Sequence, residues 1–408
     1  MEACNTWIAI VFILVVGTVP SIKAECEDYS PCICGQNAEG NLYINCIDVL
    51  PTDIQAAFSR TTALDIYSLV LILPASGGDI PADLLSGKRA LLIDFIGPSK
   101  DSFQLIMDPG ALRSSSSYTM QLVISKCNLI QLDFSFLREA GSGSSSYTMQ
   151  LVISKCNLIQ LDFSFLRGFS RLEELRLDYV SNIKPIENLP PLTNLVGLAI
   201  DNSQGFEALT GFPAVAFSQL NHLYLYNDEL NDLATGIILD AFVSSASANT
   251  LEVLTLSKNM ITQVPQQVTA LPSILNFALS NNNITLITTG ALSLAAPSKV
   301  YLNNISLDAI EADAFQGDYS YAEIDLTNNN LVSFDSLVFK PILTQMAGIA
   351  NSTGTINLAN NPFSCDCGLA WLIRDNPNLL KATNGATCAN TTRFEDLNPG
   401  GYLECGVF

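Results

Sequence analysis

A pattern of alternating apolar and polar positions recurs along the chain, and its clearest copy is residues 251–264, LEVLTLSKNMITQV. Leu254 and Leu256 are two residues apart, the spacing that places side chains on one face of a strand. Asn259 follows three residues later, and Ile261 resumes the apolar series. We therefore expect a short strand with one buried face and a turn at the asparagine. Its amide can bond the backbone groups left unpaired at that bend.

The same pattern returns in other parts of the chain. Further clear copies are residues 274–287, 324–334 and 356–363, and looser copies begin near residues 172, 195, 220 and 300. This is the leucine-rich repeat pattern, in which each copy forms one coil of a solenoid and stacked coils share a core. The sequence thus predicts an α/β solenoid, a leucine-rich repeat horseshoe with a parallel concave β-sheet. We expect its strands to start at Leu42, Leu64, Ile93, Leu122, Leu151, Leu175, Leu198, Leu223, Leu254, Phe277, Val300, Ile324 and Ile356.

Composition narrows the classes of function. Hydrophobic residues make up 48% of the chain and charged residues 14%, which favours a packed repeat core over disorder. The formal net charge of −20 argues against a nucleic-acid partner and permits a basic one. His222 is the single histidine, so a histidine-centred metal site or a Ser-His-Asp triad is disfavoured. We expect no catalytic residues, no metal, no cofactor and no enzymatic activity.

Residues 1–24 have the features of a secretory signal peptide. The apolar run from Trp7 to Val19 has the length of such a segment and is short for a bilayer span, and Ala24 supplies a small residue before a cleavage site. Glu2 and Lys23 depart from the usual charge pattern, and an uncleaved anchor is the alternative. We expect a soluble, secreted, extracellular protein that does not insert into the membrane after cleavage.

Cysteines cluster near both ends of the expected repeat array. Four in each cluster of an exported chain indicate disulfide caps over the apolar ends of a solenoid, and a zinc site is the disfavoured alternative. Sequence reasoning leaves three pairings open within each cluster. We expect an N-terminal cap at 25–50, repeats at 51–360 and a C-terminal cap at 361–408. The clustered cysteines are Cys26, Cys32, Cys34 and Cys46, then Cys365, Cys367, Cys388 and Cys405.

The C-terminal cluster carries a specific motif. Residues 361–367 read NPFSCDC and residues 369–372 read LAWL, which resembles the C-terminal caps of extracellular leucine-rich repeat proteins. The first cluster is similar to their N-terminal caps. The resemblance implies that Trp371 lies on a short helix over the core of the last coil. It also implies the disulfide pairs Cys26–Cys34, Cys32–Cys46, Cys365–Cys388 and Cys367–Cys405.

A narrower resemblance covers about the last 50 residues of the chain. The run CDCGLAWLIRDNPNLL at 365–380, followed by GATC at 385–388 and FEDLNPGGYLEC at 394–405, is similar to secreted arthropod repeat proteins. These proteins are related to the non-catalytic, leucine-rich subunit of oplophorus-luciferin 2-monooxygenase. The resemblance implies an accessory binding or stabilising role without catalysis, and it does not imply luminescence.

Residues 115–138 and 144–167 are identical. A recent tandem duplication and an assembly error both explain this, because one extra coil leaves the register of a solenoid intact. Cys127 and Cys156 occupy the turn position where asparagine stands in other copies. Two buried thiols are the favoured interpretation, since turn-position side chains point inward. An inter-coil disulfide and a reactive or intermolecular thiol are the alternatives.

Four Asn-X-Ser/Thr sequons make the chain a candidate glycoprotein. We expect the two outside the repeat phrase, Asn351 and Asn390, to be the more accessible. We expect the two beside turn positions, Asn283 and Asn304, to be partly buried.

Outward-facing strand positions define a candidate binding surface on the concave face. Aromatic and Arg side chains concentrate interface energy, so a cluster of them favours binding, and an ordinary solvated face is the alternative. We interpret the chain as a non-catalytic, protein-binding accessory subunit of an extracellular complex. An innate-immune or surface-recognition module and a matrix or cuticle component are the alternatives. The candidate residues are Glu174, Arg176, Asp178, His222, Tyr224, Tyr226, Tyr301 and Asp325.

Overall fold

The computed structural model describes residues 28–76, 79–98, 104–108, 110–115, 118–131, 149–158, 163–181, 189–203, 216–348 and 352–406. The expected signal peptide at 1–24 lies outside these ranges, as do Cys26 and Asn351.

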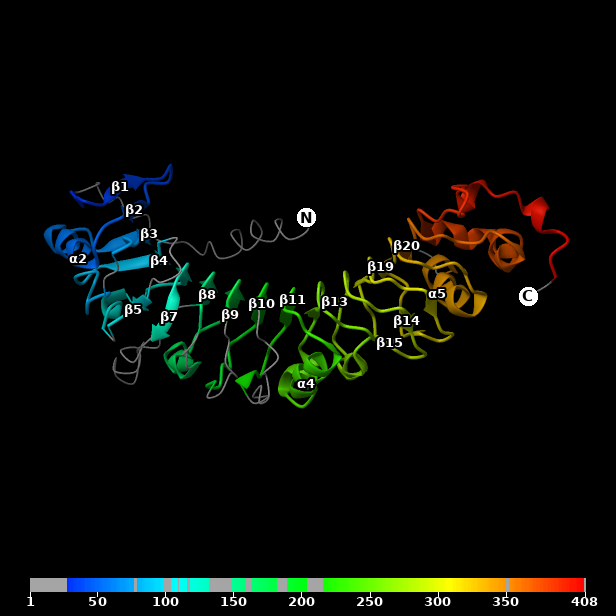
Figure 1. The fold of residues 1–408 in the computed structure, drawn as a ribbon, viewed down its shortest axis with the longest axis horizontal. Coiled ribbons are helices and arrows are strands. Elements are labelled where there is room, and N and C mark those ends of the chain that lie inside the picture. Colours follow the sequence, from blue (N-terminus) through cyan, green and yellow to red (C-terminus); the bar gives the residue numbers. More distant parts are fainter. Residues whose placement is uncertain are drawn as a thin grey trace.

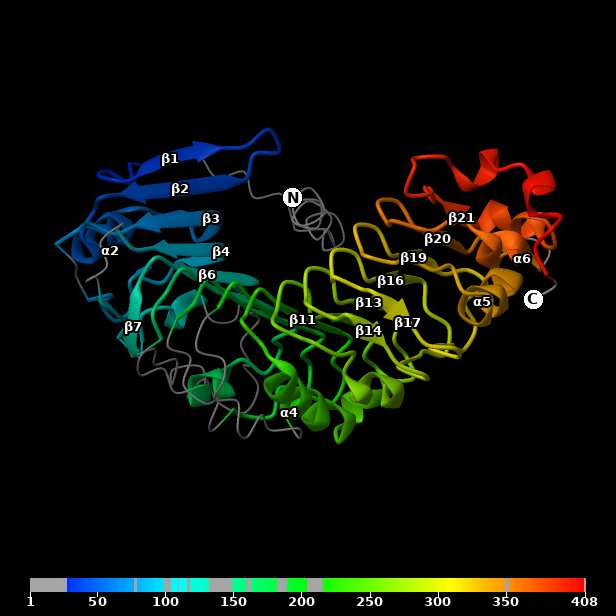
Figure 2. The same ribbon diagram turned by 45° about the vertical axis from the view of Figure 1, so that its right-hand side comes forward.

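One 15-stranded sheet lines the inner wall of a curved solenoid, which confirms the predicted horseshoe with its parallel concave sheet (Figure 1 and Figure 2). Strands β1 and β2 are antiparallel, and every later neighbouring pair in this sheet is parallel. In spatial order the strands are β1 (Ile33–Gln36), β2 (Leu42–Ile47), β3 (Asp65–Ile72), β4 (Arg89–Ile96), β6 (Gln121–Ser125), β8 (Gln150–Ser154), β9 (Glu174–Asp178), β10 (Gly197–Asp201), β11 (His222–Tyr226), β12 (Val253–Thr255), β13 (Asn276–Ala278), β16 (Lys299–Tyr301), β19 (Glu323–Asp325), β20 (Thr355–Asn357) and β21 (Thr383–Asn384).

Helices and short two-stranded ladders lie on the outer side of the solenoid in the described residues, as both views show for α2, α4 and α5. The α-helices are α2 (Pro51–Arg60), α4 (Asp232–Val243), α5 (Ser336–Gly348) and α6 (Ala370–Ile373). The ladders pair β5 (Gln104–Ile106) with β7 (Asn128–Gln131), β14 (Leu286–Ile287) with β17 (Ala309–Ile310), and β15 (Leu292–Ser293) with β18 (Phe315–Gln316). The structure also contains short 3₁₀ helices: η2 (Arg113–Ser115), η3 (Phe163–Gly168), η6 (Ala246–Asn249), η7 (Gln266–Ala270), η8 (Cys367–Leu369), η9 (Pro377–Ala382), η10 (Phe394–Asp396) and η11 (Pro399–Tyr402).

Stacked leucines fill the space between the sheet and the outer side. Leu223 of β11 is aligned with Leu198 of β10 and with Leu254 of β12, and all three are buried. Because side chains alternate along a strand, the residues directly before and after each of these leucines in its own strand face the concave side. The continuous core follows from repeating this register from coil to coil.

The register of the first coils differs from the prediction. Leu69 of β3, rather than Leu64, is aligned with Ile93 of β4. Leu64 lies before β3 and is 62% exposed. The reason is local: Tyr67 and Ser68 are neighbours and both half-buried, so the alternation breaks within this strand and shifts the buried set. A single leucine spacing cannot reveal such a break.

Buried asparagines connect successive coils at the turn after the strand. Asn282 donates through Nδ2 to the carbonyl oxygens of Leu256 at 2.9 Å and Leu279 at 2.7 Å, and its Oδ1 accepts from the Ile261 N–H at 3.0 Å. The side chain therefore pairs backbone groups of its own coil and of the preceding one, as expected from the sequence. The same arrangement recurs at Asn259, Asn329 and Asn361.

Disulfides close both ends of the array. The structure joins Cys32 to Cys46, Cys365 to Cys388 and Cys367 to Cys405, the pairs that the resemblance to capped repeat proteins implies. Cys34 is also disulfide-bonded, while its expected partner Cys26 lies outside the described residues.

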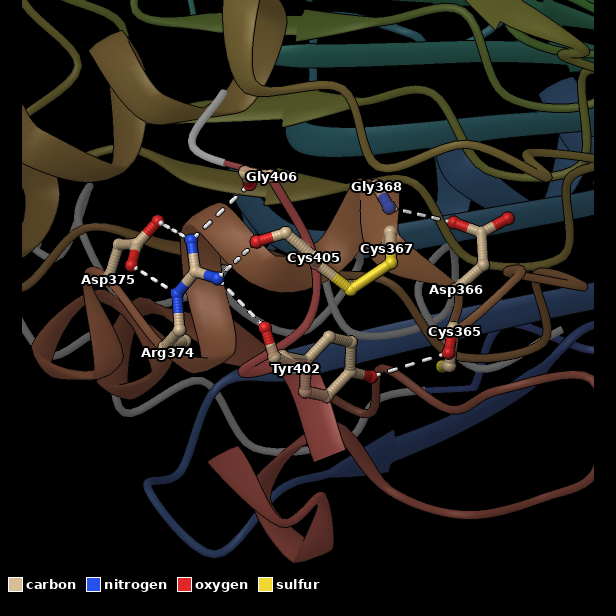
Figure 3. Close-up of a disulfide and its surroundings, with 9 residues drawn as sticks. All are labelled: Cys365, Asp366, Cys367, Gly368, Arg374, Asp375, Tyr402, Cys405 and Gly406. Carbon is tan, nitrogen blue, oxygen red and sulfur yellow. Dashed lines mark hydrogen bonds and ion pairs between the residues drawn. A yellow bond between two sulfur atoms is a disulfide. The ribbon is translucent and has the colours of Figure 1, made fainter. Parts of the chain in front are cut away.

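The C-terminal cap surrounds one arginine (Figure 3). The Arg374 guanidinium donates to the Asp375 carboxylate at 2.6 and 2.9 Å and to the carbonyl oxygens of Tyr402 and Cys405 at 2.8 Å each. It therefore holds the chain end that carries the Cys367–Cys405 disulfide against helix α6.

Trp371 on α6 covers the core of the last coils, as expected. Its indole stacks on Phe334 with the ring centroids 5.8 Å apart, and its Nε1–H donates to the Phe334 carbonyl at 3.0 Å. The side chain is buried, so this contact seals the apolar end of the solenoid.

Candidate binding surface on the concave face

Three adjacent strands bring most of the predicted site residues together. Strands β9, β10 and β11 are aligned residue for residue, so their concave side chains form three rows. The rows are Glu174, Gly197 and His222; Arg176, Ala199 and Tyr224; and Asp178, Asp201 and Tyr226.

An ion pair lies at the centre of these rows. The Arg176 guanidinium is 2.9 Å from the Asp201 carboxylate, which is mostly buried. Burial raises the pKa of Asp201 to about 6, an effect that Arg176 opposes and the neighbouring Asp178 reinforces. The Asp178 carboxylate accepts a hydrogen bond from Asn202 Nδ2 at 3.2 Å. The ion pair between adjacent strands fixes the guanidinium beside the small side chain of Ala199.

Aromatic rings border the ion pair on β11. The His222 and Tyr224 rings are stacked with centroids 6.3 Å apart, and burial lowers the pKa of His222, which favours the neutral imidazole. Lys258 Nζ lies 4.9 Å from the centroid of the Tyr226 ring. Sequence reasoning missed Lys258, because it lies in the turn after β12 and outside the strand positions that defined the candidate surface. The Lys258 ammonium therefore makes a cation–π contact with the Tyr226 ring.

Glu174 lies at the other edge of the cluster. Gln150 Nε2 donates to its carboxylate at 2.8 Å, and Gln121 Nε2 donates in turn to Gln150 Oε1 at 2.7 Å. Burial raises the pKa of Glu174. The carboxylate is therefore the end of a side-chain hydrogen-bond chain across three strands.

Two predicted residues lie apart from this cluster. Tyr301 of β16 occupies the same row as Tyr224, but Thr255 and Ala278 stand between them. At about 4.8 Å for each strand spacing, the two tyrosines are roughly 14 Å apart. Asp325 of β19 lies one strand further. The structure therefore places both on the concave face without joining them to the cluster on β9–β11.

A buried carboxylate interrupts the asparagine series directly behind the cluster. Asp228 follows β11 at the position that Asn259 occupies after β12, and it is 1% exposed. Its Oδ1 accepts from the Ser203 N–H at 2.8 Å, whereas its Oδ2 has no hydrogen-bond partner among the described residues. Burial raises the pKa of Asp228 to about 9, and the nearby Asp201 and Asp178 contribute. A neutral carboxylic acid is therefore favoured at this position at pH 7.

Cys127 and Cys156 are free and buried in stacked coils. The hydrogen bond with Cys156, burial and the proximity of the second thiol all raise the pKa of Cys127. The Cys156 thiol donates to the Ser154 carbonyl at 3.2 Å. Two free thiols buried at the turn positions agree with the favoured interpretation from the sequence.

The sequons differ from expectation in their exposure. Asn283 and Asn304 are exposed rather than partly buried, since the turn directs them away from the core, and Asn390 is exposed too. Asn304 Nδ2 donates to Asn281 Oδ1 at 2.8 Å. Asn351 lies outside the described residues.

Among the residues that the structure describes, no group of three or more His, Cys, Asp or Glu side chains is arranged to hold a metal ion. No helix in the same ranges combines the length and apolar character that a bilayer crossing requires.

A curved parallel sheet, stacked leucines, buried turn asparagines and disulfides near both ends define this chain as a protein of the leucine-rich repeat fold. No known family model matches its sequence. The chain is similar to the oplophorus-luciferin 2-monooxygenase non-catalytic subunit of Oplophorus gracilirostris, with 26% identity over 221 residues. That match covers 53% of this chain and 56% of the relative, so it spans little more than half of the relative's length. It confirms the resemblance expected from the sequence.

Solved structures share the fold at low sequence identity. A chain of the octameric complex of Latrophilin 3, Unc5D and FLRT2 matches with a TM-score of 0.51 and 15% identity, over 92% of this chain and 99% of that one. A chain of the mouse RP105/MD-1 complex matches with a TM-score of 0.51 and 17% identity, over 86% of this chain and 60% of that one.

Proposed function

We propose that this chain is a secreted, non-catalytic protein that binds a protein partner through the concave face of β9–β12, as an accessory subunit of an extracellular complex. The observation that carries the proposal is the cluster of Tyr224 and Tyr226 beside the Arg176–Asp201 ion pair. Tyrosine supplies a large contact area with little side-chain freedom to lose, and tyrosine and arginine dominate the energy of many interfaces.

The local geometry supports binding rather than catalysis. Contacts with His222 and Lys258 restrain the rings of Tyr224 and Tyr226, and the ion pair restrains Arg176. Less side-chain entropy is therefore lost on association. His222 is held against the Tyr224 ring on an open sheet, which does not exclude water from a reaction. The name of the curated relative, a non-catalytic subunit, supports the same role.

Secretion is supported by independent features of the chain. The disulfides at Cys32–Cys46, Cys365–Cys388 and Cys367–Cys405 suit an oxidising compartment. Exposed sequons at Asn283, Asn304 and Asn390 are accessible to glycosylation, and we propose them as carbohydrate sites.

Affinity purification from the extracellular fluid of the source organism tests this function. The tagged protein is used as bait without reducing agent, beside a Tyr224→Ser/Tyr226→Ser double variant and a Tyr321→Ser control. Tyr321 is 60% exposed and precedes β19 outside the cluster. We expect one stoichiometric partner that the double variant loses and the control retains. Recovery of the bait alone, in insoluble material, would contradict the proposal and favour the matrix alternative.

A further inference from the structure

Aliphatic side chains gather on the concave face of the first coils, among polar ones such as Asn45, Ser68 and Gln121. Ile47 of β2, Ile72 of β3 and Ile96 of β4 are aligned in one row across three neighbouring strands. Ile47 is 54% exposed, and the other two are half-buried. Because the core-facing positions of these strands are also apolar, both faces of the sheet carry aliphatic side chains along this row. Neighbouring aliphatic side chains on a solvent-facing surface are typical of a site that binds another molecule.

A second row extends this surface towards β8. Val70 of β3, Asp94 of β4, Val123 of β6 and Val152 of β8 are aligned, and all four are half-buried. Leu92 of β4 adds another aliphatic side chain on the same face, and it is half-buried as well. The two rows form what we call the aliphatic surface of β2–β8.

One carboxylate lies within the aliphatic surface. Asp94 is flanked by Val70 and Val123 in its row, and by Leu92 and Ile96 along its own strand. It has neither a hydrogen bond nor an ion pair with any of the described residues. Burial raises the pKa of Asp94, which shows that its surroundings oppose the charge. A half-buried carboxylate gains most from a cationic partner that arrives together with apolar groups, which exclude water from the pair.

The later strands differ in character at the same positions. The concave residues of β16 and β19 include Lys299 and Glu323, whose charged groups are 4.0 Å apart. Tyr301 and Asp325 follow in the next row. Strands β16 and β19 thus carry charged groups of both signs where β4 carries Leu92 and Asp94.

We propose that the aliphatic surface of β2–β8 binds a protein segment that presents one Lys or Arg side chain between aliphatic side chains. The cation pairs with Asp94, and the aliphatic groups cover Ile72, Ile96 and Val123. The negative net charge of −20 attracts such a segment and disfavours an acidic one. The inference rests on the proposed function in that the partner is a protein, and it adds a second contact region with its own chemistry.

The dimensions of the surface set the size of the segment. Strands β2, β3, β4, β6 and β8 are consecutive in the sheet. At about 4.8 Å for each strand spacing, they span roughly 19 Å. An extended chain covers this distance with about six residues.

Binding of short synthetic peptides measures directly whether the aliphatic surface of β2–β8 prefers a segment with a cationic side chain. The probe is the fluorescein-labelled peptide GSVLKLVSG, and its twins carry Glu or norleucine in place of Lys. Fluorescence anisotropy gives Kd for the wild type, for Asp94→Asn and for the control Asp325→Asn, which removes one carboxylate from the concave face of β19. We expect Asp94→Asn to weaken binding of the Lys peptide about tenfold, the usual scale for a hydrogen bond to a charged group. The control should stay within about twofold.

The remaining arms separate charge from apolar contact. Ile72→Ser should weaken the Lys and norleucine peptides alike, and far-UV circular dichroism checks that each variant is folded. Equal binding of the Lys and Glu peptides, equal effects of Asp94→Asn and Asp325→Asn, or no binding of the Lys peptide to the wild type would each overturn the inference. If the peptides fail while the co-purified partner still depends on Tyr224 and Tyr226, only this inference falls and the proposed function stands.

Discussion

Replacing Asp228 with asparagine tests the energetics of the turn series that joins the coils. Asn259 at the next turn donates through Nδ2 to the carbonyl oxygens of Leu225 at 2.8 Å and Leu256 at 3.0 Å. Asp228 offers Oδ2 at the equivalent atom, and an ionised carboxylate cannot donate to a carbonyl. The wild-type protein therefore either keeps Asp228 protonated or buries an unpaired negative charge.

The size of the effect follows from the shift in pKa. The pKa of Asp228 rises from the ordinary 3.8 to about 9 in the folded protein, mainly through burial. A raised folded-state pKa means that the stabilising protonation is complete below pH 3.8 and is lost as the pH rises towards 9. At pH 7 the folded protein must retain a proton that the unfolded chain releases, which costs at most about 4 kcal/mol at roughly 1.4 kcal/mol for each pH unit.

Equilibrium urea unfolding of the wild type and Asp228→Asn at pH 5, 7 and 8.5 measures this cost. We expect the variant to be more stable at pH 7 by up to about 4 kcal/mol, and its advantage to grow with pH. Asp396→Asn, which changes an exposed carboxylate in the C-terminal cap, is the control and should leave stability unchanged at each pH. An Asp228→Asn variant that is no more stable than the wild type, or whose advantage is the same at every pH, would refute the proposed cost of burying this carboxyl group.

Three other predictions concern the coils and the C-terminal cap. Asn282→Ala should lower the free energy of unfolding by about 3 kcal/mol, because three buried backbone groups lose their partner. The control Asn283→Gln, at the exposed neighbouring position, should leave the free energy of unfolding unchanged, and equal losses in both variants would contradict the prediction. Trp371→Phe should lower the melting temperature, since a buried carbonyl loses its indole donor; an unchanged value would refute the role of this bond. Cys127 and Cys156 should resist Ellman's reagent in the native protein, and two thiols should react after unfolding without reductant. Fast labelling of the native protein would contradict the burial of the thiols, and no labelling after unfolding would show that they are joined in a disulfide.

The sequence predicted the coil architecture well because one spacing, two apolar residues and a turn asparagine, sets both strand and register. It failed at β3, where two adjacent half-buried residues, Tyr67 and Ser68, displace the buried set. It also missed the aliphatic surface, although the run ALLIDFI at 90–96 has apolar residues at both alternating positions. The signal was present in that loss of alternation.

The repeat pattern could not predict which side chains of different coils contact each other. The pairing of Arg176 with Asp201 and the position of Lys258 over Tyr226 depend on how strands and turns of different coils are superimposed. Asp228 was visible as an aspartate at an asparagine position, but its burial and unpaired oxygen required the structure.

The most direct test of the account is the affinity of the co-purified partner for variants of the concave face. Isothermal titration calorimetry with that partner would compare the wild type, Tyr224→Ser/Tyr226→Ser and the exposed control Tyr321→Ser. We predict a loss of affinity of at least about a hundredfold for the double variant, because tyrosines at interface centres each contribute about 2 kcal/mol or more, and no change for the control. Equal affinity of all three proteins would contradict the claim that β9–β12 carry the binding site.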